Sequence, residues 1–226
     1  MKKIAFLVAV FGLILVACAT TPQTPPTGGI TAECPTLILG SKFIFQETNL
    51  STKKITQTIT WTIEKRGLYD GKEAYWVRVD VKKSAEDIKT KYAVYMIRDL
   101  NLNPIAVIAG DKETVSISPY IQDFSWPLFA GKKWYASYDL YDKGQWFRNI
   151  KDSVVVESHE EIVVPAGSFK TFKIKRFGDI ASFTSYHAPE IRGIMVKREI
   201  VRDSSHYQGG GRWVQELVEY NVLERR

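Results

Sequence analysis

Apolar and polar residues alternate with a period of two along most of the chain from residue 41 onward. Residues 55–63 are typical, because Ile59, Trp61 and Ile63 fall on one face and threonines fall on the other. Residues 73–82 repeat the pattern with apolar side chains at every second position. Successive side chains of a β-strand point to opposite faces, so this period is typical of strands with one face against a core. The pattern therefore predicts strands over nearly the whole length from residue 41.

Turn signals separate the apolar runs. Asp70-Gly71 predicts a type I′ hairpin, because both positions of that turn need a positive φ that Asp and Gly tolerate. Pro165-Ala166-Gly167 predicts a second tight turn, and residues 84–89 hold the one weak helical candidate. About a dozen short strands with no long helix predict an all-β domain, in which an antiparallel curved sheet forms a β-sandwich or an open barrel.

A membrane-spanning barrel is the alternative all-β architecture. Its outward face needs a continuous apolar band on nearly every strand, whereas Thr, Lys and Glu dominate the outer positions here. Residues 119–131 break the alternation with closely spaced aromatic and proline residues. We expect this irregular segment to plug an edge or an end of the sheet of a domain that does not span the membrane.

The first residues of the chain form a separate signal. Lys2 and Lys3 precede an apolar run over residues 4–17, which is shorter than the roughly 20 residues that a spanning helix needs. A charged start and a short apolar core indicate a secretory signal. An ordinary signal peptide, or an N-terminal membrane helix, followed by a coincidental cysteine is the alternative interpretation.

Leu15-Val16-Ala17-Cys18 resembles the lipobox of bacterial lipoproteins. The resemblance implies that residues 1–17 are removed and that Cys18 carries the lipid that holds the protein on a membrane. Ala19 is compatible with export to the outer membrane, where the domain would face the periplasm. Residues 18–36 then form the lipidated cysteine and a tether rich in Pro, Thr and Gly, and residues 37–226 form a single domain.

Charge and cysteine content bear on two questions, namely whether the protein binds nucleic acid and whether it forms a disulfide. The chain of 226 residues has 31 basic and 25 acidic residues and a formal charge of +6, and removal of residues 1–17 takes away two lysines. Basic and acidic residues are interspersed, so we expect no nucleic-acid partner. Cys34 is the one cysteine besides Cys18, so no intrachain disulfide is expected once Cys18 is acylated. We interpret Cys34 as a small apolar residue, and the sequence does not define another role for it.

Residue spacings give no catalytic or metal-binding motif. His159, His187 and His206 are far apart, and no Cys/His group has zinc-ligand spacing. Gly167-Ser168 lacks the Gly-x-Ser-x-Gly pattern of a nucleophile elbow. We therefore expect no metal, no cofactor and no enzymatic activity.

Three segments resemble the uncharacterised β-rich envelope proteins of the DUF3108 type. They are Trp-Pro-Leu-Phe-Ala-Gly-Lys-Lys-Trp at residues 126–134, Val-Val-Pro-Ala-Gly-Ser-Phe-Lys-Thr-Phe-Lys-Ile at residues 163–174, and the stretch around residues 186–199. Arg192 stands where that pattern favours Gly. The resemblance implies a curved antiparallel sheet and supplies no catalytic residues.

Aromatic residues are the positive functional signal. Four tryptophans are the candidate ligand-binding residues: Trp61, Trp76, Trp126 and Trp134. Core filling and cross-strand pairing are the ordinary use of such residues in a large sheet. The functional hypothesis is that the sheet binds a hydrophobic envelope ligand such as an acyl chain or lipid. The alternative is a structural or protein-interaction module of the cell envelope that docks through a sheet edge or residues 119–131.

Overall fold

A computed structural model of the chain describes residues 23–84, 91–110, 112–119, 121–142, 144–178, 181–206 and 209–223. The expected signal segment, Cys18 and the start of the tether lie outside the described residues. Most of the helical candidate at residues 84–89 lies outside them as well.

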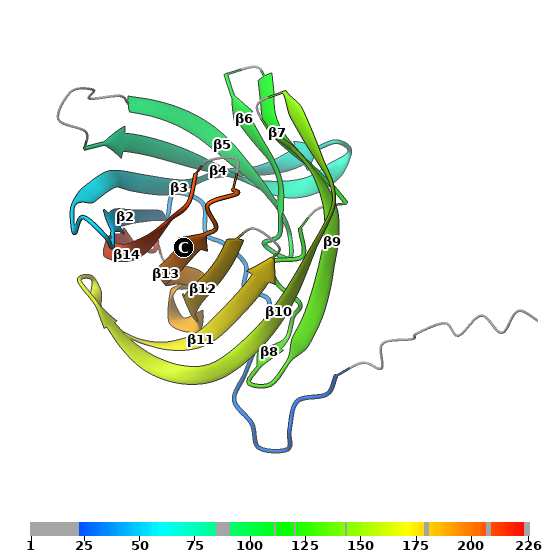
Figure 1. Ribbon diagram of the computed structural model, residues 1–226. Coiled ribbons are helices and arrows are strands. Elements are labelled where there is room, and N and C mark those ends of the chain that lie inside the picture. The colour runs from blue at the N-terminus through cyan, green and yellow to red at the C-terminus, as the bar shows by residue number, and fades with distance from the viewer. Residues whose placement is uncertain are drawn as a thin grey trace, which may run out of the picture.

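Twelve antiparallel strands of the described chain form one closed barrel (Figure 1). Their bounds are β2 (Lys42–Asn49), β3 (Ile55–Tyr69), β4 (Lys72–Lys83), β5 (Lys91–Asp99), β6 (Pro104–Ala109), β7 (Lys112–Ser118), β9 (Lys133–Asp142), β10 (Gln145–Val164), β11 (Gly167–Gly178), β12 (Ala181–Ala188), β13 (Ile194–Arg202) and β14 (Gly211–Asn221). The all-β antiparallel prediction is confirmed.

The barrel closes because the last strand pairs with the first long one. Most neighbours around the barrel are also neighbours along the chain, and β14 then pairs antiparallel with β2 from Trp213 opposite Asn49 to Asn221 opposite Lys42. The remaining junction pairs β7 with β9, across the irregular segment between them. A closed barrel satisfies the backbone groups that an open sheet would leave unpaired at its edges.

The period of two separates the inside of the barrel from its outside. Tyr75 and Val77 of β4 are 3% and 1% exposed, and Phe43 and Phe45 of β2 are equally buried. These side chains belong to the main apolar core. The apolar side chains at every second position of residues 73–82 therefore face the core, as the alternation predicts.

Left-handed backbone at two of the turns bears on the predictions from the sequence. Asp70 and Gly71 have φ values of 48° and 72°, as the predicted type I′ hairpin between β3 and β4 requires. Arg192 and Gly193, which follow the 3₁₀ helix η1 (Pro189–Ile191), have φ values of 64° and 67°. Arg192 therefore accepts the conformation for which the sequence pattern favoured Gly.

The end of the tether lies on the barrel. The short strand β1 (Thr31–Ala32) pairs antiparallel with β8 (Leu128–Phe129), and Ala32 is buried. The Gln23 side chain exchanges two hydrogen bonds of 2.8 Å with the backbone of Lys133. Packed structure in the described chain therefore begins before residue 37.

The irregular segment between β7 and β9 enters the barrel, and we call its residues 121–131 the plug segment. Phe124 is 5% exposed, and its backbone N–H donates to the Oδ1 of Asn103 at 2.8 Å. The indole N–H of Trp134 donates to the carbonyl of Gln122 at 2.7 Å. Backbone groups of an irregular segment need such partners when they leave water, and here side chains supply them.

No helix in the described residues is long and apolar enough to cross a membrane.

Candidate functional site

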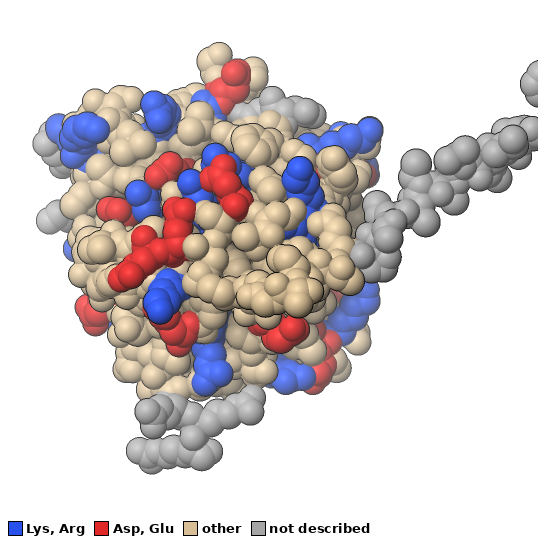
Figure 2. Space-filling model, turned by 90° about the horizontal axis from the view of Figure 1, so that it is seen from below, with Lys and Arg blue, Asp and Glu red and all other residues tan. Residues whose placement is uncertain are grey.

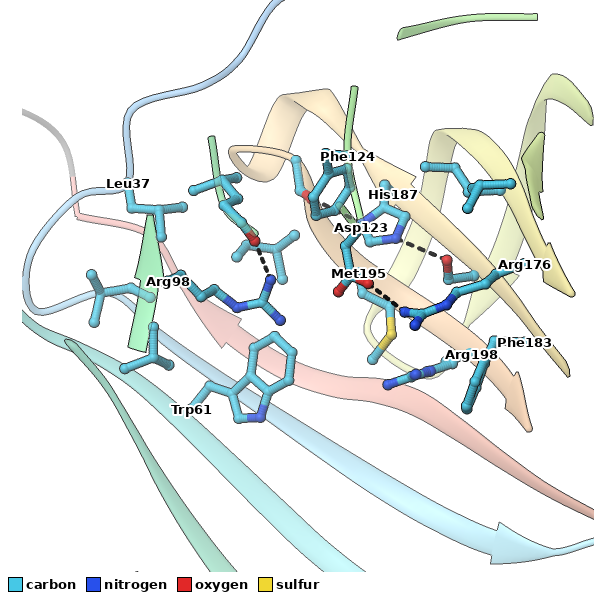
Figure 3. A pocket seen from close by; sticks show the side chains of 18 residues that line it. Leu37, Trp61, Arg98, Asp123, Phe124, Arg176, Phe183, His187, Met195 and Arg198 are labelled. Carbon is cyan, nitrogen blue, oxygen red and sulfur yellow. Dashed lines mark hydrogen bonds and ion pairs between the residues drawn. The ribbon is translucent and has the colours of Figure 1, made fainter. Parts of the chain in front are cut away.

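The barrel encloses a cavity of about 70 Å³ beside the plug segment (Figure 3). Its walls come from β3, β4, β5 and β10 to β13, together with the plug segment. The apolar lining is Leu37, Trp61, Ile63, Val77, Leu102, Phe124, Val154, Ile174, Phe183, Ile194 and Met195, and the polar lining is Arg98, Asp123, Arg176, Ser185, His187 and Arg198, with Gly193. A water needs roughly 10–15 Å³ of such space, so the cavity holds a few waters or one small polar group.

Arg176 of β11 is held by two carboxylates and a phenol. Its Nη1 donates to Asp123 at 2.6 Å, its Nε donates to Asp152 at 2.8 Å, and its Nη2 donates to the hydroxyl of Tyr138 at 2.8 Å. Burial alone would lower the pKa of Arg176, but Asp123, Tyr138 and Asp152 raise it above its ordinary value. Asp123 comes from the plug segment, so this ion pair fastens the plug to the barrel wall.

Arg98 of β5 has weaker partners. Its Nη1 donates to the carbonyl of Leu102, its Nη2 lies 3.5 Å from the sulfur of Met96, and its guanidinium lies 5.6 Å from the ring centroid of Trp61. Burial lowers its pKa, and Asp123 and Asp99 act in the opposite direction. No described carboxylate forms an ion pair with Arg98.

Arg198 of β13 stacks on an aromatic ring. Its guanidinium carbon lies 4.3 Å from the ring centroid of Phe183. Within the described part of the chain, no hydrogen bond or ion pair reaches this guanidinium. Burial lowers the pKa of Arg198 to about 10, and the positive charges of Arg176, Arg98 and Arg202 act in the same direction, while Asp123 opposes them. Figure 3 shows the three guanidinium groups pointing from different walls toward the middle of the cavity, near Asp123.

His187 and Ser185 form a third polar contact in the cavity wall. The Nδ1 of His187 lies 3.1 Å from the carbonyl oxygen of Gly193, and its Nε2 lies 3.0 Å from the Oγ of Ser185. A carbonyl only accepts, so Nδ1 carries the proton and Nε2 accepts from the serine hydroxyl. This is the contact that a serine nucleophile makes with its base.

The electrostatics of His187 oppose general-base catalysis. Burial lowers its pKa to about 4, and the charges of Arg98 and Arg198 act in the same direction, against Gly193 and Asp123. A general base works best when its pKa is near the working pH, and protonation here would place an imidazolium among arginines. The contact is therefore best explained as hydrogen bonding that satisfies a buried imidazole.

The four candidate tryptophans occupy different environments. Trp61 alone among them lines the cavity, where it packs on Phe45 with ring centroids 5.0 Å apart. Trp134 is buried in the core, and Trp126 stacks on Phe124 at 5.2 Å with its indole N–H bonded to the carbonyl of Asn101. Trp76 faces the opposite side of β4 from Tyr75, between the rings of Tyr69 and Tyr95. The four tryptophans therefore do not line one common cavity.

Sequence reasoning missed the charged residues of the cavity. Arg176 follows Phe172 and Ile174 at alternate positions of β11, which places its side chain inside the barrel. An arginine at an inward position is the signal that could have identified the site. This signal can be used only when it is known which alternate positions of the strand face the interior. Asp123 lies in an irregular segment without alternation, so the sequence does not show which way its side chain points.

No group of His, Cys, Asp and Glu side chains in the described residues is arranged to hold a metal ion. Figure 2 shows basic and acidic side chains interspersed on the face that it presents.

Comparison with solved structures shows the fold. A protein from Bacteroides fragilis NCTC 9343, classed as exported and of YmcC-like fold, matches with a TM-score of 0.50 and 16% identity, over 84% of this chain and 99% of that one. A protein from Parabacteroides distasonis ATCC 8503, classed as a lipoprotein, matches with a TM-score of 0.44 and 14% identity over the same shares. No family model and no curated protein matches the chain. At this identity, the likeness to the Bacteroides protein shows a shared YmcC-like fold and nothing of activity.

Proposed function

We propose that this chain is an exported envelope lipoprotein that binds an amphiphilic ligand inside its barrel. The lipobox-like residues 15–18 support the membrane anchor, and the fold that the chain shares with a protein classed as exported agrees with export. Ala19 supports an outer-membrane position facing the periplasm. The likeness of residues 126–134 and 163–174 to DUF3108-type sequences supports a distant relation to those envelope proteins.

One observation carries the ligand proposal, namely that the cavity inside the barrel combines an apolar lining with a guanidinium that has no carboxylate partner among the described residues. Trp61, Phe183 and Met195 supply apolar and aromatic surface beside Arg198. Sites for small molecules usually have this composition, with a few polar groups set in an apolar wall. At about 70 Å³ the cavity accommodates the head of a ligand or a few methylenes. Phe124 of the plug segment lines both this cavity and the groove outside it, so a whole acyl chain would need the plug segment to move.

Binding without catalysis follows from the same electrostatics. Ser185 is the hydroxyl best placed for attack, yet its partner His187 has a pKa near 4 and holds a proton poorly at neutral pH. We therefore propose a carrier or sensor and not a hydrolase.

Native mass spectrometry of the full chain, purified from membranes in an uncharged detergent, tests this function. We expect a bound species of lipid mass that survives detergent exchange and is lost on unfolding. Phe183→Ala should enlarge the cavity and weaken retention of that species, whereas Leu68→Ala, at a side chain 69% exposed on β3, should leave it unchanged. A protein that carries no such species, from several growth conditions, contradicts the proposal.

A specific observation also favours the alternative, a protein-interaction module. A groove of about 620 Å³ lies outside the cavity, against the plug segment and β9, and is lined by Asn101, Gln122, Trp126 and Tyr135 among others. Tyr135 is 78% exposed, so its ring is available to a partner. The barrel strands of the described residues pair into a closed ring, so that sheet offers no free edge at which a partner could dock.

In-cell photocrosslinking separates the two functions. A crosslinking residue at Tyr135 should capture one defined envelope protein if the groove is an interface, and the same residue at Leu68 should not. If Tyr135 captures no protein while the purified chain carries lipid, the interaction function is wrong.

A further inference from the structure

The charges that face the cavity do not balance. Three arginines line the cavity, Arg98, Arg176 and Arg198. The charge of Asp99, which lies outside the lining, acts on Arg98 without an ion pair. Two carboxylates bond to these arginines, namely Asp123 in the lining and Asp152 outside it. Both carboxylates bond to Arg176, so neither is paired with Arg98 or Arg198. His187 adds no charge at neutral pH, because its pKa is lowered to about 4. The unbalanced charge is therefore located on the side of Arg98 and Arg198.

Aromatic stacking leaves the donors of these two arginines available. The guanidinium of Arg198 stacks on Phe183, and that of Arg98 lies against Trp61. A cation–π contact uses the flat face of the guanidinium, while its N–H bonds point outward in its plane. Arg98 donates to the carbonyl of Leu102 and to the sulfur of Met96, and Arg198 donates to none of the described residues. Both arginines are half-buried in the cavity wall, where a charge-assisted hydrogen bond to an oxyanion is stronger than a neutral one.

We propose that the cavity is an oxyanion site, in which Arg198 and Arg98 bind the single carboxylate or phosphate group of the ligand. This assignment rests on the proposed function and names the chemical class of the ligand. The guanidinium fork matches both kinds of oxyanion, because two parallel N–H donors meet two oxygens. The volume of about 70 Å³ agrees with one such group as the part of the ligand that enters.

Asp123 is the internal competitor at this site. It reaches the cavity from the plug segment, bonds to Arg176 at 2.6 Å, and its charge acts on Arg98, Arg198 and His187. A bound oxyanion beside it would feel like-charge repulsion, which weakens binding. Removal of the Asp123 charge should therefore strengthen binding of an anion, and Arg176 keeps Asp152 as its partner in that variant.

Isothermal titration of the full chain in dodecyl maltoside micelles tests the assignment, with empty micelles as the blank. The probes are octanoate, octyl phosphate and octanol, which share a chain and differ in their head. We expect one of the two anions to bind about tenfold or more tighter than octanol, since a charge-assisted hydrogen bond is worth at least that factor. Preference for octanoate identifies a carboxylate ligand, and preference for octyl phosphate identifies a phosphate ligand.

Variants locate the site. Arg198→Met should weaken binding of the preferred anion by about tenfold or more, and Asp123→Asn should strengthen it. Lys197→Met is the matched control, because it removes the same charge from the preceding residue of β13, whose side chain pairs with Glu199. Should Arg198→Met fail to fold, Arg198→Lys keeps the charge without the fork and should weaken binding of the anion.

Two results distinguish failure of the site from failure of the function. The oxyanion site is wrong if octanol binds as tightly as both anions. It is also wrong if Arg198→Met and Lys197→Met bind the preferred anion equally well. In either case the proposal that the barrel binds a ligand is not contradicted. If none of the three probes binds and the chain purified from membranes carries no lipid, the proposed function is wrong as well.

Discussion

At the scale of single residues, His187 makes stability depend on pH. The imidazole contacts Phe124 edge-on at 4.8 Å, and burial lowers its pKa from 6.5 to about 4. Between these two values the unfolded chain binds a proton that the folded chain does not. The free energy of unfolding should therefore fall as pH falls from about 6.5 to 4, by up to about 3 kcal/mol from this group.

Urea unfolding at pH 7 and pH 4.5, for the wild type and His187→Gln, measures this contribution. The variant should lose less stability between the two pH values, because glutamine does not titrate. Carboxylates titrate in both proteins, so the difference between the two losses isolates His187. Equal losses in the two proteins would show that His187 is protonated in the folded state.

Cys34 is the second residue whose chemistry the fold changes. Its thiol lies 3.3 Å from the carbonyl oxygen of Leu100 and packs against the core. Burial, followed by the charges of Asp99 and Glu33, raises its pKa from 9.0 to about 11. The thiolate is the reactive form, so alkylation by iodoacetamide at pH 8 should be about 100-fold slower than for an ordinary thiol. Peptide mass spectrometry of folded and urea-unfolded protein measures this, and equal rates in the two states contradict it.

At the scale of elements, the β3–β4 hairpin gives a matched pair of glycines. Gly71 has a φ of 72°, whereas Gly67 of β3 has no positive φ, and an added Cβ meets no atom within 4 Å at either position. Gly71→Ala should cost about 1 kcal/mol, because a Cβ disfavours the left-handed region. Gly67→Ala should change stability by less than about 0.5 kcal/mol. Urea midpoints of the two variants test this, and a larger loss for Gly67→Ala would show that backbone conformation does not decide the cost.

The elements also show which features of the fold can be predicted from the sequence. The alternation that includes Tyr75 and Val77 predicts both the strand and its inward face, because the period is a local property. The hairpin at Asp70-Gly71 is likewise local. Closure of the barrel is not a local property. It depends on pairs such as Gln215 with Glu47, which are 168 residues apart and hydrogen-bonded at 2.8 Å. The cavity depends in turn on that closure, so its arginines looked like ordinary strand residues until their common interior was known.

At the scale of the whole molecule, the barrel and its N-terminal segment act together. β1 pairs with β8 at the end of the plug segment, so the chain that leaves the barrel toward Cys18 begins beside the element that carries Asp123. Gln23 already bonds to Lys133 on the barrel, and the few residues between Cys18 and Gln23 could span at most roughly 15 Å when extended. If Cys18 carries the lipid, the barrel should stay close to the membrane surface, with the plug segment near the point of attachment.

The last prediction concerns that attachment. If Leu15-Val16-Ala17-Cys18 is a lipobox, the intact mass of the membrane-extracted protein should show cleavage before Cys18 and the added mass of acyl chains. More than one buried chain gives stable anchoring, so the protein should stay in the membrane fraction at high salt. Cys18→Ser should abolish processing, while Cys34→Ser, which removes the other cysteine, should leave processing and membrane attachment unchanged. Release of soluble protein that starts at an unmodified Cys18 would show an ordinary signal peptide, and the barrel would then meet its ligand free in solution instead of beside a membrane.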